Sequence, residues 1–255
     1  MDAVLLAGGG SDPTDPLHEL AGGRAKALLP IAGKSMGQWV LDALEATGRV
    51  GRIVVVGLGP DCGLRSLKID AWLPDTGSLF GNARSGAEAI LSVGGGPLVL
   101  LASVDVPALL PSHVDWVVDR ALETEDDFYY SVIDRAIMER EFPGSGRSYI
   151  RFRDREVCGG DLTVIRPAAL AGSGSIWKRL TAGRKSSARI ALSVGVDVLL
   201  KLLFRRLAVA DAVRIASGRL GFRGRALDCP HAELGMDVDK PFQHAMLERF
   251  LGERT

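Results

Sequence analysis

Three aspartates of this sequence stand in surroundings that could hold a divalent cation. Asp105 follows an aliphatic run at residues 98–103, and Pro107 keeps the chain around it extended. Asp237 and Asp239 alternate along a second extended segment, so their side chains face the same way. Protein carboxylates, together with phosphate oxygens and water, are the ligands that Mg²⁺ prefers. The three acids could therefore bind a cation such as Mg²⁺, although Asp105 could instead be a helix-capping or loop residue and Asp239 could cap the final helix.

A glycine-rich turn is the second feature that could bind a ligand. Gly8, Gly9 and Gly10 follow the aliphatic run at residues 3–7. In open α/β sheets, ligands sit beyond the carboxyl ends of strands, and glycine lets backbone N–H groups approach a phosphate. Two common phosphate motifs are absent, because a dinucleotide fingerprint needs glycine in place of Pro13 and a Walker A loop needs it in place of Leu28. A phosphate-binding turn and a merely tight turn both fit these glycines.

The elements that must position these residues alternate between strand and helix in the first half of the chain. Short, continuous aliphatic runs predict buried parallel strands, and helical spacing of apolar residues lies between them. We therefore expect an α/β fold, with a three-layer, doubly wound, mostly parallel sheet and a helical elaboration in the C-terminal half. The predicted strands are residues 3–7, 52–57, 98–103, 128–133, 149–153 and 161–165. The predicted helices are residues 36–47, 85–93, 111–122, a region within 175–217, and 241–250.

The middle and the composition of the chain add further expectations. The strands after residue 128 have no predicted helix between them, which favours an inserted hairpin or a mixed-sheet extension. Within the predicted helical region 175–217, the run at residues 196–213 is apolar on nearly all sides, which suits the core, the contact of a homodimer, or a helix on a membrane surface. With 47% hydrophobic and 24% charged residues among 255, wholesale disorder is excluded, and residues 1–255 are expected to form a single domain.

Charge and cysteine content limit which partners and which cellular compartment are expected for this protein. The formal net charge of zero argues against binding of nucleic acid through bulk charge. Apolar runs are too short for a membrane span or a secretory signal, and the three separated cysteines suit a reducing compartment. We therefore expect a cytoplasmic protein.

One stretch of sequence has a recognisable pattern. The segment LLAGGG is followed by KALLPIAGK and then by an amphipathic helix. Together they resemble the nucleotidyltransferases with a glycosyltransferase-A-type fold, which include sugar-phosphate nucleotidylyltransferases and molybdenum-cofactor guanylyl- and cytidylyltransferases. Asp105 matches the metal-binding aspartate of that family. The segment with Asp237 and Asp239 resembles its D-x-D-x-P-x-D motif, although Gln243 replaces the final acid.

The resemblance implies a function and a set of site residues. It implies Mg²⁺-dependent transfer of an NMP from a nucleoside triphosphate to a phosphorylated small-molecule acceptor, with release of pyrophosphate. Lys26 and Asp105 would be catalytic, with Asp105, Asp237 and Asp239 at the metal. Acceptor contacts would come from the variable region 120–230, with Gly160 and Asp161 as candidates ahead of a predicted strand. The nucleotide contacts would be Leu6, Ala7, Gly8, Gly9, Gly10, Arg24 and Lys26, with Gly77, Gly81 and Asn82 in a base-recognising loop.

Two other functions remain open from the sequence. A glycosyltransferase of the same fold would also need paired acids for a metal, although the KALLPIAGK segment argues against it. A nucleotide-binding protein without catalysis is the second alternative, because Asp12 and Asp15 would repel a triphosphate unless they point away from it.

Overall fold

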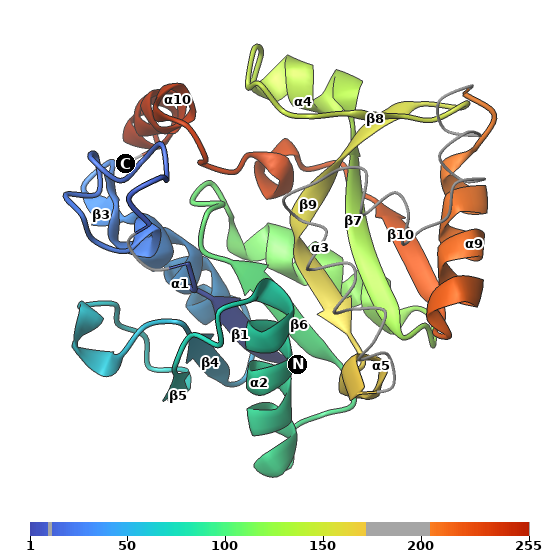
Figure 1. The fold of residues 1–255 in the computed structure, drawn as a ribbon, viewed down its shortest axis with the longest axis horizontal. Coiled ribbons are helices and arrows are strands. Elements are labelled where there is room, and N and C mark those ends of the chain that lie inside the picture. The colour runs from blue at the N-terminus through green and yellow to red at the C-terminus, as the bar shows by residue number, and fades with distance from the viewer. Residues whose placement is uncertain (10–11, 172–204, 255) are drawn as a thin grey trace.

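The structure is a computed structural model of the chain, and it describes residues 1–9, 12–171 and 205–254. Figure 1 shows a twisted sheet with helices on both faces. The strands are β1 (Asp2–Leu6), β2 (Pro30–Ile31), β3 (Lys34–Ser35), β4 (Ile53–Val56), β5 (Ile69–Leu73), β6 (Val99–Ser103), β7 (Phe128–Asp134), β8 (Ile150–Arg151), β9 (Glu156–Ile165) and β10 (Gly224–Asp228). The α-helices are α1 (Met36–Ala46), α2 (Leu79–Ser92), α3 (Pro111–Leu122), α4 (Arg135–Glu141), α5 (Pro167–Ala171), α9 (Val209–Leu220) and α10 (Pro241–Gly252).

The main sheet of the described residues is mixed but mostly parallel. Its strand order is β10-β7-β9-β6-β1-β4-β5, and β8 pairs with β9 at the side. Strands β5, β4, β1 and β6 run parallel, whereas β9 is antiparallel to both β6 and β7. The predicted α/β class and the mixed extension after residue 128 are therefore confirmed.

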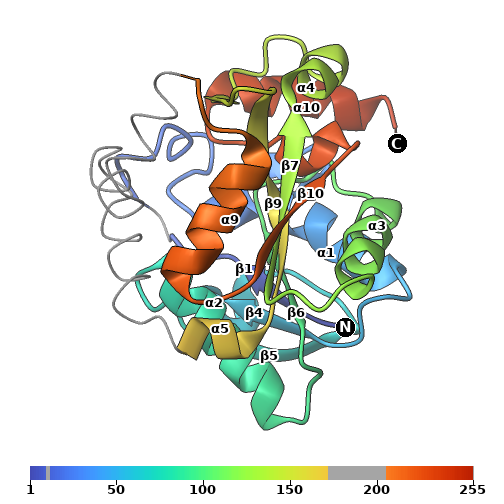
Figure 2. The same cartoon turned by 90° about the vertical axis from the view of Figure 1, so that its right-hand side faces the viewer.

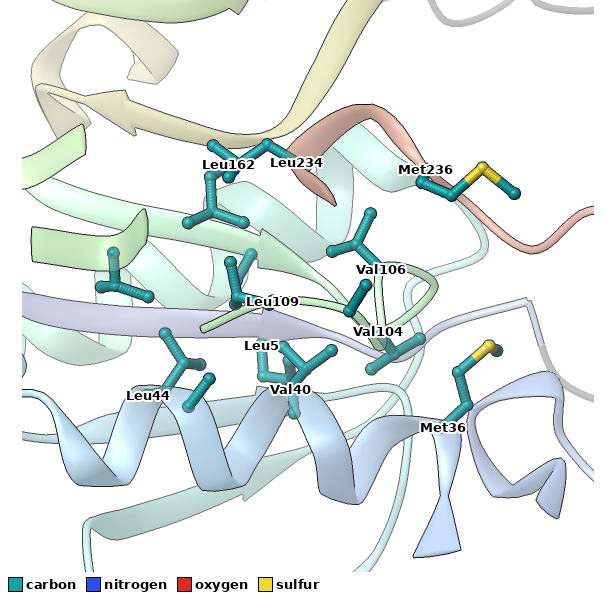
Figure 3. Packing of buried hydrophobic residues seen from close by; sticks show 14 of the residues in the cluster. Leu5, Met36, Val40, Leu44, Val104, Val106, Leu109, Leu162, Leu234 and Met236 are labelled. Carbon is teal, nitrogen blue, oxygen red and sulfur yellow. The ribbon is translucent and has the colours of Figure 1, made fainter. Parts of the chain in front are cut away.

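The core lies on both faces of this sheet. On β1, Leu5 packs with α1 and α3, whereas Val4 packs with α2 on the opposite face. Figure 2 shows α1 and α3 on one side, with α2, α5 and α9 on the other, and Figure 3 shows Met36, Val40 and Leu44 of α1 pointing toward the sheet. Because central strands are covered on both faces, they consist of unbroken aliphatic runs, and this is why the sequence revealed them.

Three local predictions are wrong. Helix α2 begins at Leu79 rather than at residue 85, and Ser78 caps it by accepting a hydrogen bond from the N–H of Gly81 at 3.0 Å. Helix α4 lies between β7 and β8, where no helix was expected; Met138 is its one buried residue, so its sequence has no apolar period. The strand predicted at residues 161–165 begins earlier, at Glu156 of β9, so Gly160 and Asp161 lie inside the strand rather than at its start. Of the predicted helical region 175–217, residues 175–204 lie outside the described residues, and α9 begins in the remaining part, at Val209.

A buried histidine at the start of α3 makes stability depend on pH. The Nδ1 atom of His113 accepts the N–H of Leu110 at 3.2 Å. Burial, with the nearby His231 and Arg254 acting in the same direction, lowers the pKa of His113 to about 4. The unfolded chain binds this proton below its ordinary pKa of about 6.5, whereas the native protein does so only near pH 4. Stability should therefore fall as the pH drops through this window.

The variant His113→Asn tests this dependence, because asparagine can still accept the N–H of Leu110 but does not titrate. Between pH 7 and pH 4, the free energy of unfolding of the wild type should fall by roughly 3 kcal/mol more than that of the variant. Urea unfolding at several pH values measures the difference. Parallel pH profiles for the two proteins would contradict the prediction.

Candidate active site

A cavity of about 600 Å³ opens beyond the carboxyl ends of β1, β5 and β6. These parallel strands end at the same edge of the sheet, where ligands bind in open α/β folds. The side of the cavity near α10 is formed by a segment from the far end of the chain, which Figure 1 shows passing the turn after β6. The cavity is lined by Leu6, Gly8, Gly9, Asp15, Lys26, Asp75, Gly77, Ser78, Leu79, Asn82, Ser103, Val104, Asp105 and Asp239.

The KALLPIAGK segment delivers its first lysine to this cavity. Lys26 begins a short 3-10 turn. The next residue, Ala27, is buried in the core, whereas Lys26 lines the cavity. The chain then forms the hairpin β2–β3, whose turn residues Ala32 and Gly33 both have positive φ. Helix α10 is fastened to this hairpin, because Glu248 accepts the N–H of Ala32 at 2.8 Å. The hairpin therefore places Lys26 beside the segment that precedes α10.

Two of the predicted metal ligands meet at Lys26. Its Nζ lies 3.5 Å from Oδ2 of Asp105 and forms an ion pair with Asp239. The N–H of Val238 donates to the carbonyl of Asp105 at 2.9 Å, so a backbone hydrogen bond joins the two acidic segments. Although burial disfavours its charge, Lys26 has a raised pKa because Asp105 and Asp239 lie close. For Asp239 burial likewise opposes the charge, but Lys26 holds its pKa below the usual range.

The third predicted ligand, Asp237, is paired with an arginine that sequence reasoning missed. Arg147 forms an ion pair with Asp237, and its guanidinium also donates to the carbonyl of Gly159 at 3.0 Å. Burial raises the pKa of Asp237, even though Arg147 favours its charge. Asp161 on β9 lies close enough to be affected: burial, with Asp105 and Asp237 adding to it, raises its pKa well above the ordinary value.

Three acids of this cluster each have one carboxylate oxygen without a hydrogen-bond partner within the described residues. These buried atoms are Oδ1 of Asp105, Oδ2 of Asp161 and Oδ1 of Asp237. Asp105, Asp237 and Asp239 are paired there with two cations, Lys26 and Arg147. A buried carboxylate oxygen without a partner is unfavourable unless a cation or a donor joins it. An all-oxygen donor set with excess negative charge fits Mg²⁺.

On the opposite side of the cavity, Asp75 connects the glycine turn to the segment before α2. Its Oδ2 accepts the N–H of Gly9 and its Oδ1 accepts the N–H of Gly77, both at 2.8 Å. Oδ1 also accepts from the side-chain amide of Asn82 at 3.0 Å. The hydrogen bond from Gly9, followed by those from Gly77 and Asn82, lowers the pKa of Asp75. The carboxylate therefore stays charged and fixes both loops that were predicted to contact a nucleotide.

Gly8 is required by close packing at this point. A Cβ at position 8 would lie 2.2 Å from Nδ2 of Asn82 and 3.1 Å from the carboxylate of Asp75. We expect Gly8→Ala to push Asn82 and Asp75 apart and to lower the free energy of unfolding by about 1–3 kcal/mol, as overpacking usually does. Urea unfolding measures the loss. The matched control is Gly48→Ala, where a Cβ meets nothing within 4 Å; equal losses in the two variants would contradict the prediction.

The structure brings most of the predicted site residues to one cavity, but not all. Of the predicted nucleotide and metal residues, those that line the cavity are Leu6, Gly8, Gly9, Lys26, Gly77, Asn82, Asp105 and Asp239. Ala7 is buried, Gly81 lies within α2, and Arg24 is exposed with its Nε donating to the carbonyl of Ala21. Asp237, the third metal candidate, and Asp161 do not line the cavity, but both lie close enough to Asp105 and Asp239 for their charges to interact. Gly160 lies within β9. Gly10 lies outside the described residues.

The two unusual aspartates of the first loop behave differently. Asp12 turns back on its own loop, where Oδ1 accepts from the N–H and the hydroxyl of Thr14 at 2.8 and 2.7 Å. Asp15 accepts the N–H of Leu17 at 2.8 Å but also lines the cavity, where its charge helps to raise the pKa of Lys26. One of the two acids thus points away, and the other adds negative charge beside the lysine.

A separate histidine cluster lies outside this cavity. Among the described residues, His113, His231 and Glu233 place ligand atoms within 4.8 Å of one another. Nitrogen ligands of this kind suit transition metals better than Mg²⁺. The N–H of Leu110 already points at Nδ1 of His113, so the neutral ring carries its proton on Nε2 and that atom has no lone pair for a metal. The cluster is therefore not part of the proposed magnesium site.

Comparison with known proteins decides the family. A family model described as the MobA-like NTP transferase domain matches residues 3–210. The chain belongs to this family. A hypothetical transferase from Thermus thermophilus has a similar structure, with 34% identity, a TM-score of 0.83, and coverage of 95% of this chain and 98% of that one. Among curated proteins, none matches the sequence.

More distant structures share the fold. The CMP:2-keto-3-deoxy-manno-octonic acid synthetase in complex with CTP has a TM-score of 0.61, with 12% identity and full coverage of both chains. A nucleotidyl transferase from Methanothermobacter has a TM-score of 0.57, with 16% identity and coverage of 100% of this chain and 98% of that one. As a member of the MobA-like NTP transferases, the protein is a nucleotidyltransferase. Among its described helices, none has both the length and the apolar character needed to cross a bilayer.

Proposed function

We propose that this MobA-like NTP transferase is Mg²⁺-dependent and moves an NMP from a nucleoside triphosphate to a phosphorylated small-molecule acceptor. The observation that carries the proposal is the convergence of Asp105, Asp237 and Asp239 on Lys26 and Arg147, with buried carboxylate oxygens that no donor among the described residues satisfies. These acids would hold Mg²⁺, which when bound neutralises charge on the phosphates. Because Asp105 is distant in sequence from Asp237 and Asp239, their meeting is a property of the tertiary fold and not a by-product of local structure.

The reaction needs little beyond positioning and charge. An acceptor phosphate is ionised near neutral pH, so its oxygen can attack the α-phosphorus without a strong general base. As that bond forms, the bond from the α-phosphorus to the bridging oxygen breaks, and pyrophosphate leaves with the electron pair. Lys26 lines the same cavity as the glycine turn and offsets the negative charge that develops on the phosphates. Asp75 keeps the turn and the segment with Gly77 in place.

The acceptor is assigned to the side of the acids that faces β9. Asp161 lies there with a buried oxygen that has no hydrogen-bond partner in the described part of the chain, and Arg147 spans from Asp237 to the carbonyl of Gly159. Asp161 and Gly160 are the proposed acceptor contacts from β9. Asp161 is the stronger candidate of the two, because its side chain has an oxygen that could contact the acceptor. Gly160 packs against Ser131 and Ile133.

Thermal unfolding with each of the four common nucleoside triphosphates, with and without Mg²⁺, tests the proposal. CTP is the first to try, since a structure of the same fold was solved with it. A triphosphate at 100 times its Kd should stabilise the protein by about 2.7 kcal/mol, and only when Mg²⁺ is present. The stabilising triphosphate is then incubated with phosphorylated acceptors, and pyrophosphate is measured. Stabilisation by nucleotide-sugars alone would indicate a glycosyltransferase, and binding without pyrophosphate release for any acceptor would indicate a protein that only binds nucleotides.

A further inference from the structure

Gln243 is a buried amide that touches both sides of the acidic cluster without being an acid itself. It lies in the first turn of α10 and its exposed fraction is 3%. Its Oε1 accepts the N–H of Asp239 at 2.9 Å, and its Nε2 donates to the carbonyl of Ser145 at 3.0 Å. One side chain thus joins the segment before α10 to the segment that follows α4.

The first contact is made with a proposed metal ligand, and the second is made with the segment that carries the partner of another. The first contact fixes the backbone of Asp239. The second holds Ser145, which is fully buried, two residues before Arg147, the partner of Asp237. The residue between them has a φ of 69°, and a Cβ on Gly146 would lie 2.6 Å from the ring of Phe242. The segment that carries Arg147 is therefore packed against the start of α10, beside Gln243.

The chemistry of the amide explains why both contacts can exist together. An amide has an acceptor and a donor, so it can satisfy the N–H of Asp239 and the carbonyl of Ser145 at once. A carboxylate of the same size could accept from Asp239 but would face the carbonyl of Ser145 with no proton to donate. Leaving that buried carbonyl without a donor would destabilise the segment that carries Arg147.

We propose that Gln243 is a positioning residue that sets Asp237 and Asp239 together, the first through the Ser145–Arg147 segment and the second through its own backbone N–H. The inference rests on the proposed function, because it treats these two acids as ligands of a divalent cation. Some groups do not touch the metal but hydrogen-bond to its ligands and orient them. Removing such a group typically weakens metal binding by roughly 10- to 100-fold. Gln243 is expected to act in this way.

The first test measures binding of Mn²⁺, added alone, by electron paramagnetic resonance. Gln243→Met removes both hydrogen bonds at similar size, and we expect Mn²⁺ to bind roughly tenfold more weakly or worse. Gln243→Glu removes only the donor to Ser145. The added negative charge would by itself strengthen cation binding, so weaker Mn²⁺ binding by Gln243→Glu would isolate the loss of that donor.

Gln38 provides the matched control. It also bridges two segments with both ends of its amide, because Oε1 accepts the N–H of Arg65 at 2.9 Å and Nε2 donates to the carbonyl of Arg65 at 2.8 Å. It does not line the cavity. Gln38→Met should lower the Tm in a comparable way and leave the Mn²⁺ affinity unchanged. If Gln243→Met folds and its Mn²⁺ affinity stays within about twofold of the wild type, or falls no further than that of Gln38→Met, the proposal is wrong.

Hydrogen exchange followed by mass spectrometry gives a readout that needs no metal. In Gln243→Met, exchange should become faster in residues 145–147 and in residues 237–239. In Gln243→Glu, it should become faster in residues 145–147 only, because a carboxylate still accepts the N–H of Asp239. Unchanged exchange in both segments of Gln243→Met would overturn the proposed coupling. Failure of the wild type to bind Mn²⁺, with or without a triphosphate, would instead remove the magnesium proposal, and the exchange pattern would still decide whether Gln243 holds the two segments.

Discussion

Asp105→Asn is expected to abolish the magnesium-dependent part of nucleotide binding and to slow nucleotidyl transfer by roughly 100-fold or more. Asparagine keeps the size of the side chain and its backbone surroundings, including the hydrogen bond from Val238 to the carbonyl of residue 105. It removes the negative charge and one of the two oxygens, of which Oδ1 has no partner within the described residues. The expected loss thus comes from the missing charge rather than from a disturbed fold.

Isothermal titration of the preferred triphosphate with and without Mg²⁺ measures this effect. Asp119→Asn is the control, because Asp119 is a half-exposed aspartate on α3 that pairs with Arg49 at 2.7 Å and does not line the cavity. It should bind Mg²⁺ and triphosphate as the wild type does. An Asp105→Asn protein that still binds the triphosphate more tightly with Mg²⁺ than without it would show that Asp105 is not a metal ligand.

Lys26→Met is expected to change the binding of metal and of nucleotide in opposite directions. The lysine now occupies oxygens of both Asp105 and Asp239. Without it, those acids have more negative charge to offer, so Mn²⁺ added alone should bind several-fold more tightly. The triphosphate loses a charge-assisted contact worth about 1.5–3 kcal/mol, so with Mn²⁺ saturating it should bind roughly 10- to 100-fold more weakly.

Two titrations separate these effects, one with Mn²⁺ alone and one with the triphosphate at saturating Mn²⁺. Lys34→Met is the control, since Lys34 pairs with Asp42 on the surface and does not line the cavity. Its two affinities should match those of the wild type. If Lys26→Met weakened both Mn²⁺ and triphosphate binding, the lysine would have a structural role in the cluster, and its assignment to the phosphates would fail.

The predictable part of this molecule was encoded in short stretches of sequence. The aliphatic runs of β1, β4 and β6 mark strands covered on both faces, and the residues that follow them, the glycine turn and Asp105, fall at the edge where ligands bind. Helix α3 lies at residues 111–122, as its apolar spacing predicted. These features depend only on local pattern and on the rule that parallel strands end at one edge.

The missed residues depend on contacts that no local pattern encodes. Asp75 follows β5, just as Asp105 follows β6, but β5 is a partly buried edge strand interrupted by Asp70 and lacks an aliphatic run. An acid shortly after a weak strand is the signal that could have found it. Arg147 lies in a loop that gives no local sign of its partner, because Asp237 is distant in sequence. Helix α2 begins at Leu79, ahead of the predicted start at residue 85, and the part that was missed contains Gly81, a residue type that disfavours a helix. Gly86 lies inside the predicted helix, and the structure needs a glycine there for close packing on Val4.

The hydrogen bond between Val238 and Asp105 has a consequence for biosynthesis. While the ribosome is still translating the region after β9, the emerged chain already contains the glycine turn, Lys26 and Asp105, but two of the three proposed metal acids have not been made. A nascent or proteolytically shortened chain that stops before Met236 would therefore retain the central strands but lack the segment that forms the side of the cavity near α10. If these acids hold the cation as proposed, competence to bind it arises only once the segment with Asp237 and Asp239 has been made, so chains that lack this segment should not bind Mg²⁺ at the site.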